Sequence, residues 1–89
     1  MISRETSEMP HTGAFVELRG TEYPNFPGTP VFGRVTKVSG ETVELAVDPD
    51  AGLGCFIERN ASEVFLRKGM EVPVFQVTAI AKSIAEAVS

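Results

Sequence analysis

The chain has 89 residues, of which 43% are hydrophobic and 22% are charged, and its formal net charge at pH 7 is −4. This length leaves room for one domain with a thin core, and the apolar content is too high for a disordered chain. The acidic balance argues against strong, non-specific binding to nucleic acid, because contacts with phosphates require a basic surface.

The sequence contains no apolar run near the length of about 18 residues that a membrane span needs. Its first residues lack the basic-then-apolar pattern of a secretory signal, and its single cysteine, Cys55, cannot form an internal disulfide. We therefore expect a cytoplasmic protein with no membrane partner, in which Cys55 is a small buried hydrophobe. Residues 1–12 are predicted to form a flexible arm before a single β-barrel domain at residues 13–89.

The first half of the chain favours β-strands. Residues 14–19 alternate between apolar and polar side chains, which predicts a half-buried strand. Residues 20–30 hold three prolines and two glycines and predict an ordered loop. Residues 31–38 and 42–48 predict a hairpin around Gly40, and Gly33 suggests a bulge or bend in the first of these strands.

The second half mixes turns, strands and helices. Residues 49–54 predict a turn and residues 54–59 a short strand, and the spacing of Asn60 and Glu63 is that of a capping box for a helix over 61–68. Residues 70–80 are rich in β-formers and predict another strand. The apolar stripe that ends the chain predicts a helix docked on the barrel or on another subunit. The fold class expected is all-β, or β with minor α: a small five- to six-stranded OB-like barrel with one short internal helix and a C-terminal helix.

Three stretches resemble the ribosomal S-one-type OB-fold RNA-binding domain. The stretch Gly33–Val38 is similar to the family's opening strand, Asp48–Gly54 to its turn into the third strand, and Leu66–Val72 to its entry into the fourth. This resemblance covers about 50 residues within 31–80 and implies a barrel that binds RNA. Two departures are that Val43 stands where the family has an aromatic residue, and that a helical pattern follows residue 80.

The sequence contains no constellation typical of an enzyme. One histidine, His11, and one cysteine cannot supply the three or four ligands of a zinc site, and no glycine-rich phosphate loop occurs. Asp48 and Asp50 flank Pro49, where turn chemistry is favoured over a weak cation site. We expect no catalytic residue, no metal and no cofactor.

The candidates for binding are aromatic and basic side chains on the strands. Such pairs can stack on bases and neutralise phosphates, each stacked base contributing roughly 1–3 kcal/mol. The predicted partner is single-stranded nucleic acid, RNA in particular, bound weakly by Phe15, Arg19, Phe32, Arg34, Lys37 and Arg59.

Two alternatives remain open from the sequence. The first is a protein–protein or self-association module, such as a homodimer, whose interface consists of Tyr23, Phe26, Ile80, Ile84 and Val88. The second is a barrel that binds a small ligand or oxyanion at a subunit junction. It is based on a similarity to the oxyanion-binding barrels that accompany molybdate transport.

Overall fold

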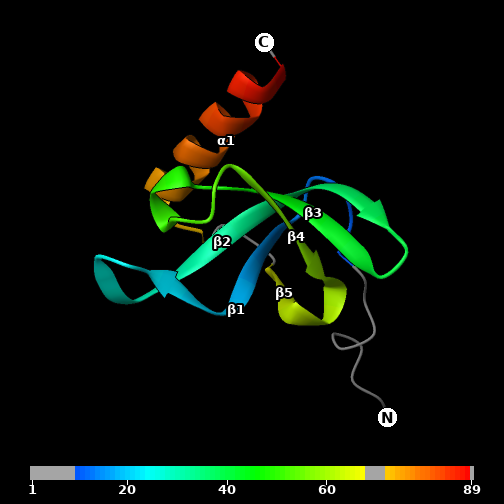
Figure 1. Ribbon diagram of the computed structural model, residues 1–89, viewed down its shortest axis with the longest axis horizontal. Helices are drawn as coiled ribbons and strands as arrows, with labels where there is room; N and C mark the ends of the chain where they lie inside the picture. The colour runs from blue at the N-terminus through cyan, green and yellow to red at the C-terminus, as the bar shows by residue number, and fades with distance from the viewer. Residues whose placement is uncertain (1–9, 68–71, 89) are drawn as a thin grey trace.

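The computed structural model describes residues 10–67 and 72–88, with side chains up to Ala87 (Figure 1). Its elements in chain order are β1 (Phe15–Tyr23), β2 (Phe26–Ser39), β3 (Thr42–Val47), the 3-10 helix η2 (Pro49–Ala51), β4 (Phe56–Asn60), the 3-10 helix η3 (Ala61–Glu63), β5 (Val64–Arg67) and α1 (Val74–Val88).

The strands form one antiparallel sheet in the order β4-β3-β2-β1-β5. The prediction of a small β-dominated fold with five strands and a C-terminal helix is confirmed. The closed barrel is wrong, because β4 and β5 are the two edges of the sheet. Since η3 alone joins these edges, the sheet must curl strongly at that end. The sequence predicts a further strand over residues 70–80. Of these, residues 70–71 lie outside the described residues, and helix α1 begins at Val74 instead.

The core lies on one face of this curled sheet. Alternate residues of neighbouring strands are cross-strand partners there, as in the pairs of Val35 with Leu45 and of Leu18 with Val64. The buried cluster consists of Val16, Leu18, Tyr23, Val31, Val35, Val43, Leu45, Val47, Ala51 and Val64. The alternation of residues 14–19 and 42–48 in the sequence therefore predicts the core side of β1 and β3, although Ala46, on the opposite side of β3, is also buried.

Gly33 is required by close packing rather than by a bulge. It pairs regularly with Val16 on β1 and with Val47 on β3. A Cβ atom at Gly33 would lie 3.1 Å from Val47 Cγ1 and 3.2 Å from Leu45 Cβ. The bulge in β2 falls further along, between Val35 and Lys37.

The segment expected to be a loop, residues 20–30, is the tip of a β-hairpin. β1 continues to Tyr23 and β2 begins at Phe26, and these two residues are cross-strand partners. The prolines of this segment are compatible with the hairpin because Pro24 lies in the turn between the strands and Pro27 lies where the register shifts between the Glu22–Pro30 and Tyr23–Phe26 pairs. The hairpin predicted around Gly40 is confirmed, with this glycine in the left-handed region at φ 61°.

The short internal helix predicted over 61–68 is wrong for most of its length. The capping box of Asn60 and Glu63 is present, but it closes only the three-residue 3-10 helix η3. The chain then enters β5, which pairs with β1. Strand pairing overrides the helical pattern here because Val64 and Leu66 reach the core side of the sheet.

Helix α1 begins at Val74, inside the segment predicted to be a strand, and Figure 1 shows it rising from one end of the sheet. Its buried residues are Gln76, Ile80 and Ser83, spaced by four and three, which is the period of a helix. The Ser83 hydroxyl donates to the Val47 carbonyl oxygen at 3.4 Å. Within the described residues, no helix has the length and apolar character that crossing a membrane requires.

Cys55 and the N-terminal arm differ from what the sequence predicts. Cys55 is exposed rather than buried, because it lies in the bend before β4, where its carbonyl oxygen accepts from the Val47 N–H at 2.9 Å. Most of the predicted N-terminal arm, residues 1–9, lies outside the described residues. The following Pro10 is buried, and the Gly13 N–H donates to Val35 O at 2.8 Å, so the end of the arm packs on the sheet.

Candidate arginine–aromatic binding face

The face of the sheet opposite the core gathers basic and aromatic side chains from three adjacent strands. We call this surface the arginine–aromatic face. Its residues are Phe15, Glu17 and Arg19 on β1, Phe32 and Arg34 on β2, and Phe65 and Arg67 on β5.

Strand register brings these residues together. Phe15 is the cross-strand partner of both Arg34 and Arg67, and Glu17 is the partner of both Phe32 and Phe65. Residues directly opposite each other in an antiparallel pair project to the same side of the sheet. Strand β1, which lies between β2 and β5, therefore places the Phe15 ring opposite two arginines and the Glu17 carboxylate opposite two phenylalanines.

Each arginine of this face lies near an aromatic ring. Arg19 Cζ is 3.8 Å from the centroid of Phe65, which is stacking distance. Arg34 Cζ is 5.6 Å from the Phe15 centroid, and Arg67 Cζ is 5.9 Å from the Phe32 centroid. Stacking on a ring orients a guanidinium but leaves its in-plane N–H groups able to donate to a carboxylate or phosphate.

The charge of this face differs in sign from that of the whole chain. Among the seven residues of this face, three arginines stand beside one carboxylate, that of Glu17, whose Oε1 lies 3.4 Å from the Nη1 of Arg67. The chain as a whole carries twelve acidic and eight basic residues. The arrangement therefore concentrates positive charge where aromatic surface is also available.

Exposure decides which groups a partner can reach. Arg19 and Arg34 are exposed, and 43% of Phe65 is accessible. Phe32 is only 4% exposed, so it supports the face from below and cannot stack on a base. The reachable part of the face is thus two guanidiniums with one open ring and the half-buried Phe15.

Four of the six residues predicted to bind nucleic acid belong to this face: Phe15, Arg19, Phe32 and Arg34. Lys37 lies beyond the bulge of β2, opposite Glu44, and Arg59 pairs with Val43 of the core, on the other side of the sheet. The register therefore separates Arg59 from the predicted group. The binding role of all six stays a prediction.

The predicted interface residues do not form one surface. Tyr23 and Ile80 are buried within the chain, whereas Phe26 is exposed and Ile84 is half-buried. The side chain of Val88 lies outside the described residues. Ile80 packs inside its own chain because it continues the buried stripe of α1. A role of these residues in self-association stays a prediction.

Sequence reasoning missed Phe65 and Arg67, because both fall in the segment assigned to a helix. The available signal was the run Val64-Phe65-Leu66-Arg67, which begins with two β-formers. In an extended strand, Val64 and Leu66 share one face, and Phe65 and Arg67 share the other. The capping box next to it gave the stronger local signal and led to the wrong element.

The titratable residues of the loops take part in local structure. Asp48 Oδ1 accepts from the Asp50 N–H at 2.9 Å, which is the turn chemistry predicted for this aspartate. Across residues 10–67 and 72–88, no three His, Cys, Asp or Glu side chains lie close enough together to hold a metal ion. His11 is exposed.

Comparison with known proteins gives one informative similarity. No family model and no solved structure matches the chain. A probable formaldehyde dehydrogenase, AdhA, of Bacillus subtilis (strain 168) is 37% identical over 65 residues, which cover 64% of this chain and 19% of the relative. The chain thus spans about a fifth of the length of the protein it resembles.

Proposed function

We propose that the chain is a non-catalytic β-module of a dehydrogenase-like protein that acts on a small aldehyde, and that it docks on its protein partner through the arginine–aromatic face. The observation that carries this proposal is the 37% identity over 65 residues with the probable formaldehyde dehydrogenase. The module contacts its protein partner, and other parts of the assembly carry out the oxidation.

The extent of the similarity supports a non-catalytic role. The matched segment is 19% of the relative, so the similarity concerns about a fifth of that protein. Hydride transfer depends on a bound cofactor whose position the protein must fix against the substrate. A segment of this size supplies a scaffold for such a site more readily than the site itself.

The composition of the arginine–aromatic face supports docking on a protein. Arginine and aromatic side chains are enriched at the centres of protein interfaces, where they supply much of the binding energy. Arg19 and Arg34 are exposed beside Phe15 and Phe65, so the face offers apolar contact and charged hydrogen-bond donors together. Its complement is a partner surface that carries carboxylates around an apolar centre.

A chimera tests this proposal. The matched segment of the Bacillus subtilis protein is replaced by the matched segment of this chain, and aldehyde oxidation is measured beside the unaltered relative. We expect a folded chimera that retains measurable oxidation, because equivalent segments share a fold and a contact surface. A chimera with native circular dichroism and no activity would contradict the proposal, as would activity of this chain alone.

A second function, weak binding of single-stranded nucleic acid, is favoured by the stacked arginines. Arg19 on Phe65 and Arg34 near Phe15 form the kind of cationic and aromatic platform on which bases stack. The net charge of −4 limits this function to a local site whose affinity falls steeply with salt.

Titration with labelled single-stranded RNA and DNA tests the second function. At low salt we expect Arg34→Ser to weaken binding by about fivefold, whereas Lys37→Ser, outside the face, changes it less than twofold. Moderate salt should weaken the binding of nucleic acid by both variants. Absence of binding at tens of micromolar protein in low salt removes this function and leaves the docking proposal unaffected.

A further inference from the structure

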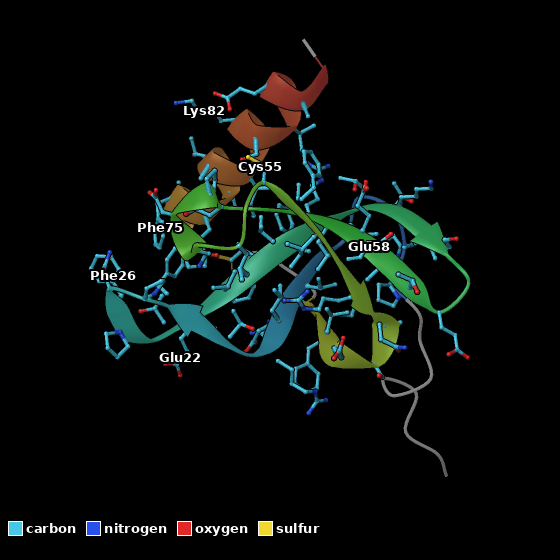
Figure 2. All side chains as sticks on the ribbon, in the orientation of Figure 1. Glu22, Phe26, Cys55, Glu58, Phe75 and Lys82 are labelled. Atoms are coloured by element: carbon cyan, nitrogen blue, oxygen red, sulfur yellow. The ribbon has the colours of Figure 1, made fainter. Side chains whose placement is uncertain are left out.

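A pocket of about 230 Å³ opens at the tip of the β1–β2 hairpin, away from the arginine–aromatic face. The hairpin, the start of η2 and the first turn of α1 contribute its walls. The lining residues are Tyr23, Asn25, Phe26, Asp48, Asp50 and Phe75. Figure 2 shows Phe26 and Phe75 projecting at the same end of the molecule.

Three aromatic rings stand around this pocket. The Tyr23 ring lies 6.4 Å from that of Phe26 at an interplanar angle of 77°, and 5.9 Å from that of Phe75 at 52°. Phe26 and Phe75 are 63% and 56% exposed, although they are large apolar side chains. Tyr23 is buried and its ring packs against both phenylalanine rings, so Phe26 and Phe75 are the rings that an occupant of the pocket can reach.

Two carboxylates complete the pocket. Asp48 is buried, and its Oδ2 accepts from the Tyr23 hydroxyl at 2.5 Å, while Asp50 is exposed at the rim. Among the described residues, no lysine, arginine or histidine forms an ion pair with either aspartate. Lys82 lines a separate pocket beside α1 that also reaches Asp48 and Asp50. The pocket thus combines a negative floor with aromatic walls.

The local sequence builds this arrangement from the chain's own turns. Tyr23 ends β1 and Phe26 begins β2, so a two-residue turn sets their rings side by side. Asp48 is the N-cap of η2 and is fixed by the Asp50 N–H. Phe75 lies in the first turn of α1, whose position is held by the hydrogen bonds of Gln76 to β2.

We propose that this pocket binds an organic cation, an alkylated ammonium group of the kind found in choline or methylated lysine. Aromatic cages bind such groups because the ring faces attract a diffuse positive charge that is weakly hydrated. The carboxylates of Asp48 and Asp50 add attraction for positive charge, and they disfavour anions. The pocket volume is several times the roughly 30 Å³ that one water molecule occupies in the liquid, so a small branched cation fits inside it. This inference is independent of the proposed function.

Comparison of choline with its neutral isostere tests the proposal. The isostere has a quaternary carbon in place of the nitrogen, so size and shape are retained and only the charge is lost. Tyr23 is the single tyrosine and the chain has no tryptophan, so tyrosine fluorescence reports directly on the pocket. We expect saturable binding of choline and binding of the isostere that is about tenfold weaker.

Variants locate the binding. Phe75→Leu and Asp50→Asn change exposed residues of the pocket, and each is expected to weaken choline binding about fivefold while circular dichroism is unchanged. The matched control is Phe65→Leu, an exposed phenylalanine on the arginine–aromatic face, which should leave choline binding unaltered. Equal affinity for choline and isostere, no saturable signal, or an equal loss in the control would overturn the proposal.

Discussion

Replacement of Gln76 by leucine is expected to lower the free energy of unfolding by about 2–4 kcal/mol. Gln76 is fully buried on α1, and its side chain completes the hydrogen bonding of β2. Its Oε1 accepts from the Phe32 N–H at 2.9 Å, and its Nε2 donates to the Pro30 carbonyl oxygen at 3.1 Å. The amide therefore takes the place of a peptide group of a neighbouring strand.

The large effect follows from where β3 ends. The pairing of β2 with β3 stops at Gly33 and Val47, so the earlier part of β2 has no strand on that side. Leucine fills a similar volume but leaves the N–H of Phe32 and the carbonyl of Pro30 without these partners. Each buried polar group that loses its partner costs about 1–3 kcal/mol.

Urea unfolding followed by circular dichroism measures this effect. The control is Thr78→Ala, an exposed position on the same helix, which should change the free energy of unfolding by less than about 0.5 kcal/mol. A Gln76→Leu protein as stable as the control would show that α1 does not complete the hydrogen bonding of β2 beyond the end of β3.

Replacement of Tyr23 by phenylalanine is expected to cost about 1.5–3 kcal/mol at neutral pH. The hydroxyl of Tyr23 donates to Asp48 Oδ2 at 2.5 Å, and both residues are buried. A hydrogen bond to a carboxylate is stronger than one between neutral groups, and its loss leaves that oxygen buried without this donor.

The contribution of Tyr23 should also depend on pH. Burial, the hydrogen bond to Asp48 and the charges of Asp48 and Asp50 raise the pKa of Tyr23 well above its ordinary value of 10.0. Below that value both the folded and the unfolded protein keep the hydroxyl protonated, so the contribution is complete. As the pH rises further, the unfolded chain ionises first, and the stabilisation is lost progressively.

Unfolding at about pH 8 and about pH 11 checks this sign. The difference in stability between wild type and Tyr23→Phe should narrow by about 1.4 kcal/mol at the higher pH. Deprotonation of lysines affects both proteins alike and cancels in the difference. A difference that stays constant over this range would contradict a raised tyrosine pKa.

The sequence predicts well those elements whose local pattern agrees with their tertiary setting. β1 alternates between buried and outward residues from Phe15 to Arg19, β3 alternates from Thr42 to Leu45, and Gly40 fits a tight hairpin turn. Their identity and buried faces could be read directly, because one side of the sheet covers the core and the other does not.

Two segments could not be predicted because local and tertiary signals disagree. Val64–Arg67 follows a capping box, yet the chain pairs it with β1, where Val64 and Leu66 pack on the core side. Val74–Val88 begins with β-formers, yet Gln76, Ile80 and Ser83 lie on one buried face of a helix. Gln76 hydrogen-bonds to β2, and Ser83 hydrogen-bonds to β3. Both choices depend on partners distant in sequence.

The candidate site was predictable only in part for the same reason. Phe15 with Arg19, and Phe32 with Arg34, share faces of their own strands, so each pair was visible in the sequence. That these pairs become neighbours depends on the register of β1 with β2. The addition of Phe65 depends on the pairing of β5, which the sequence did not indicate.

The central claim is that the arginine–aromatic face docks on a protein partner, and paired variants in the chimera test it most directly. Arg34 and Lys37 both fall inside any continuous stretch that covers 64% of the chain. In the isolated chain, exchanging either residue for serine should change stability little, because both are exposed. In the chimera, we predict that Arg34→Ser lowers the melting temperature by about 2–4 °C and Lys37→Ser does not. Equal melting temperatures for the two chimeric variants would contradict the claim.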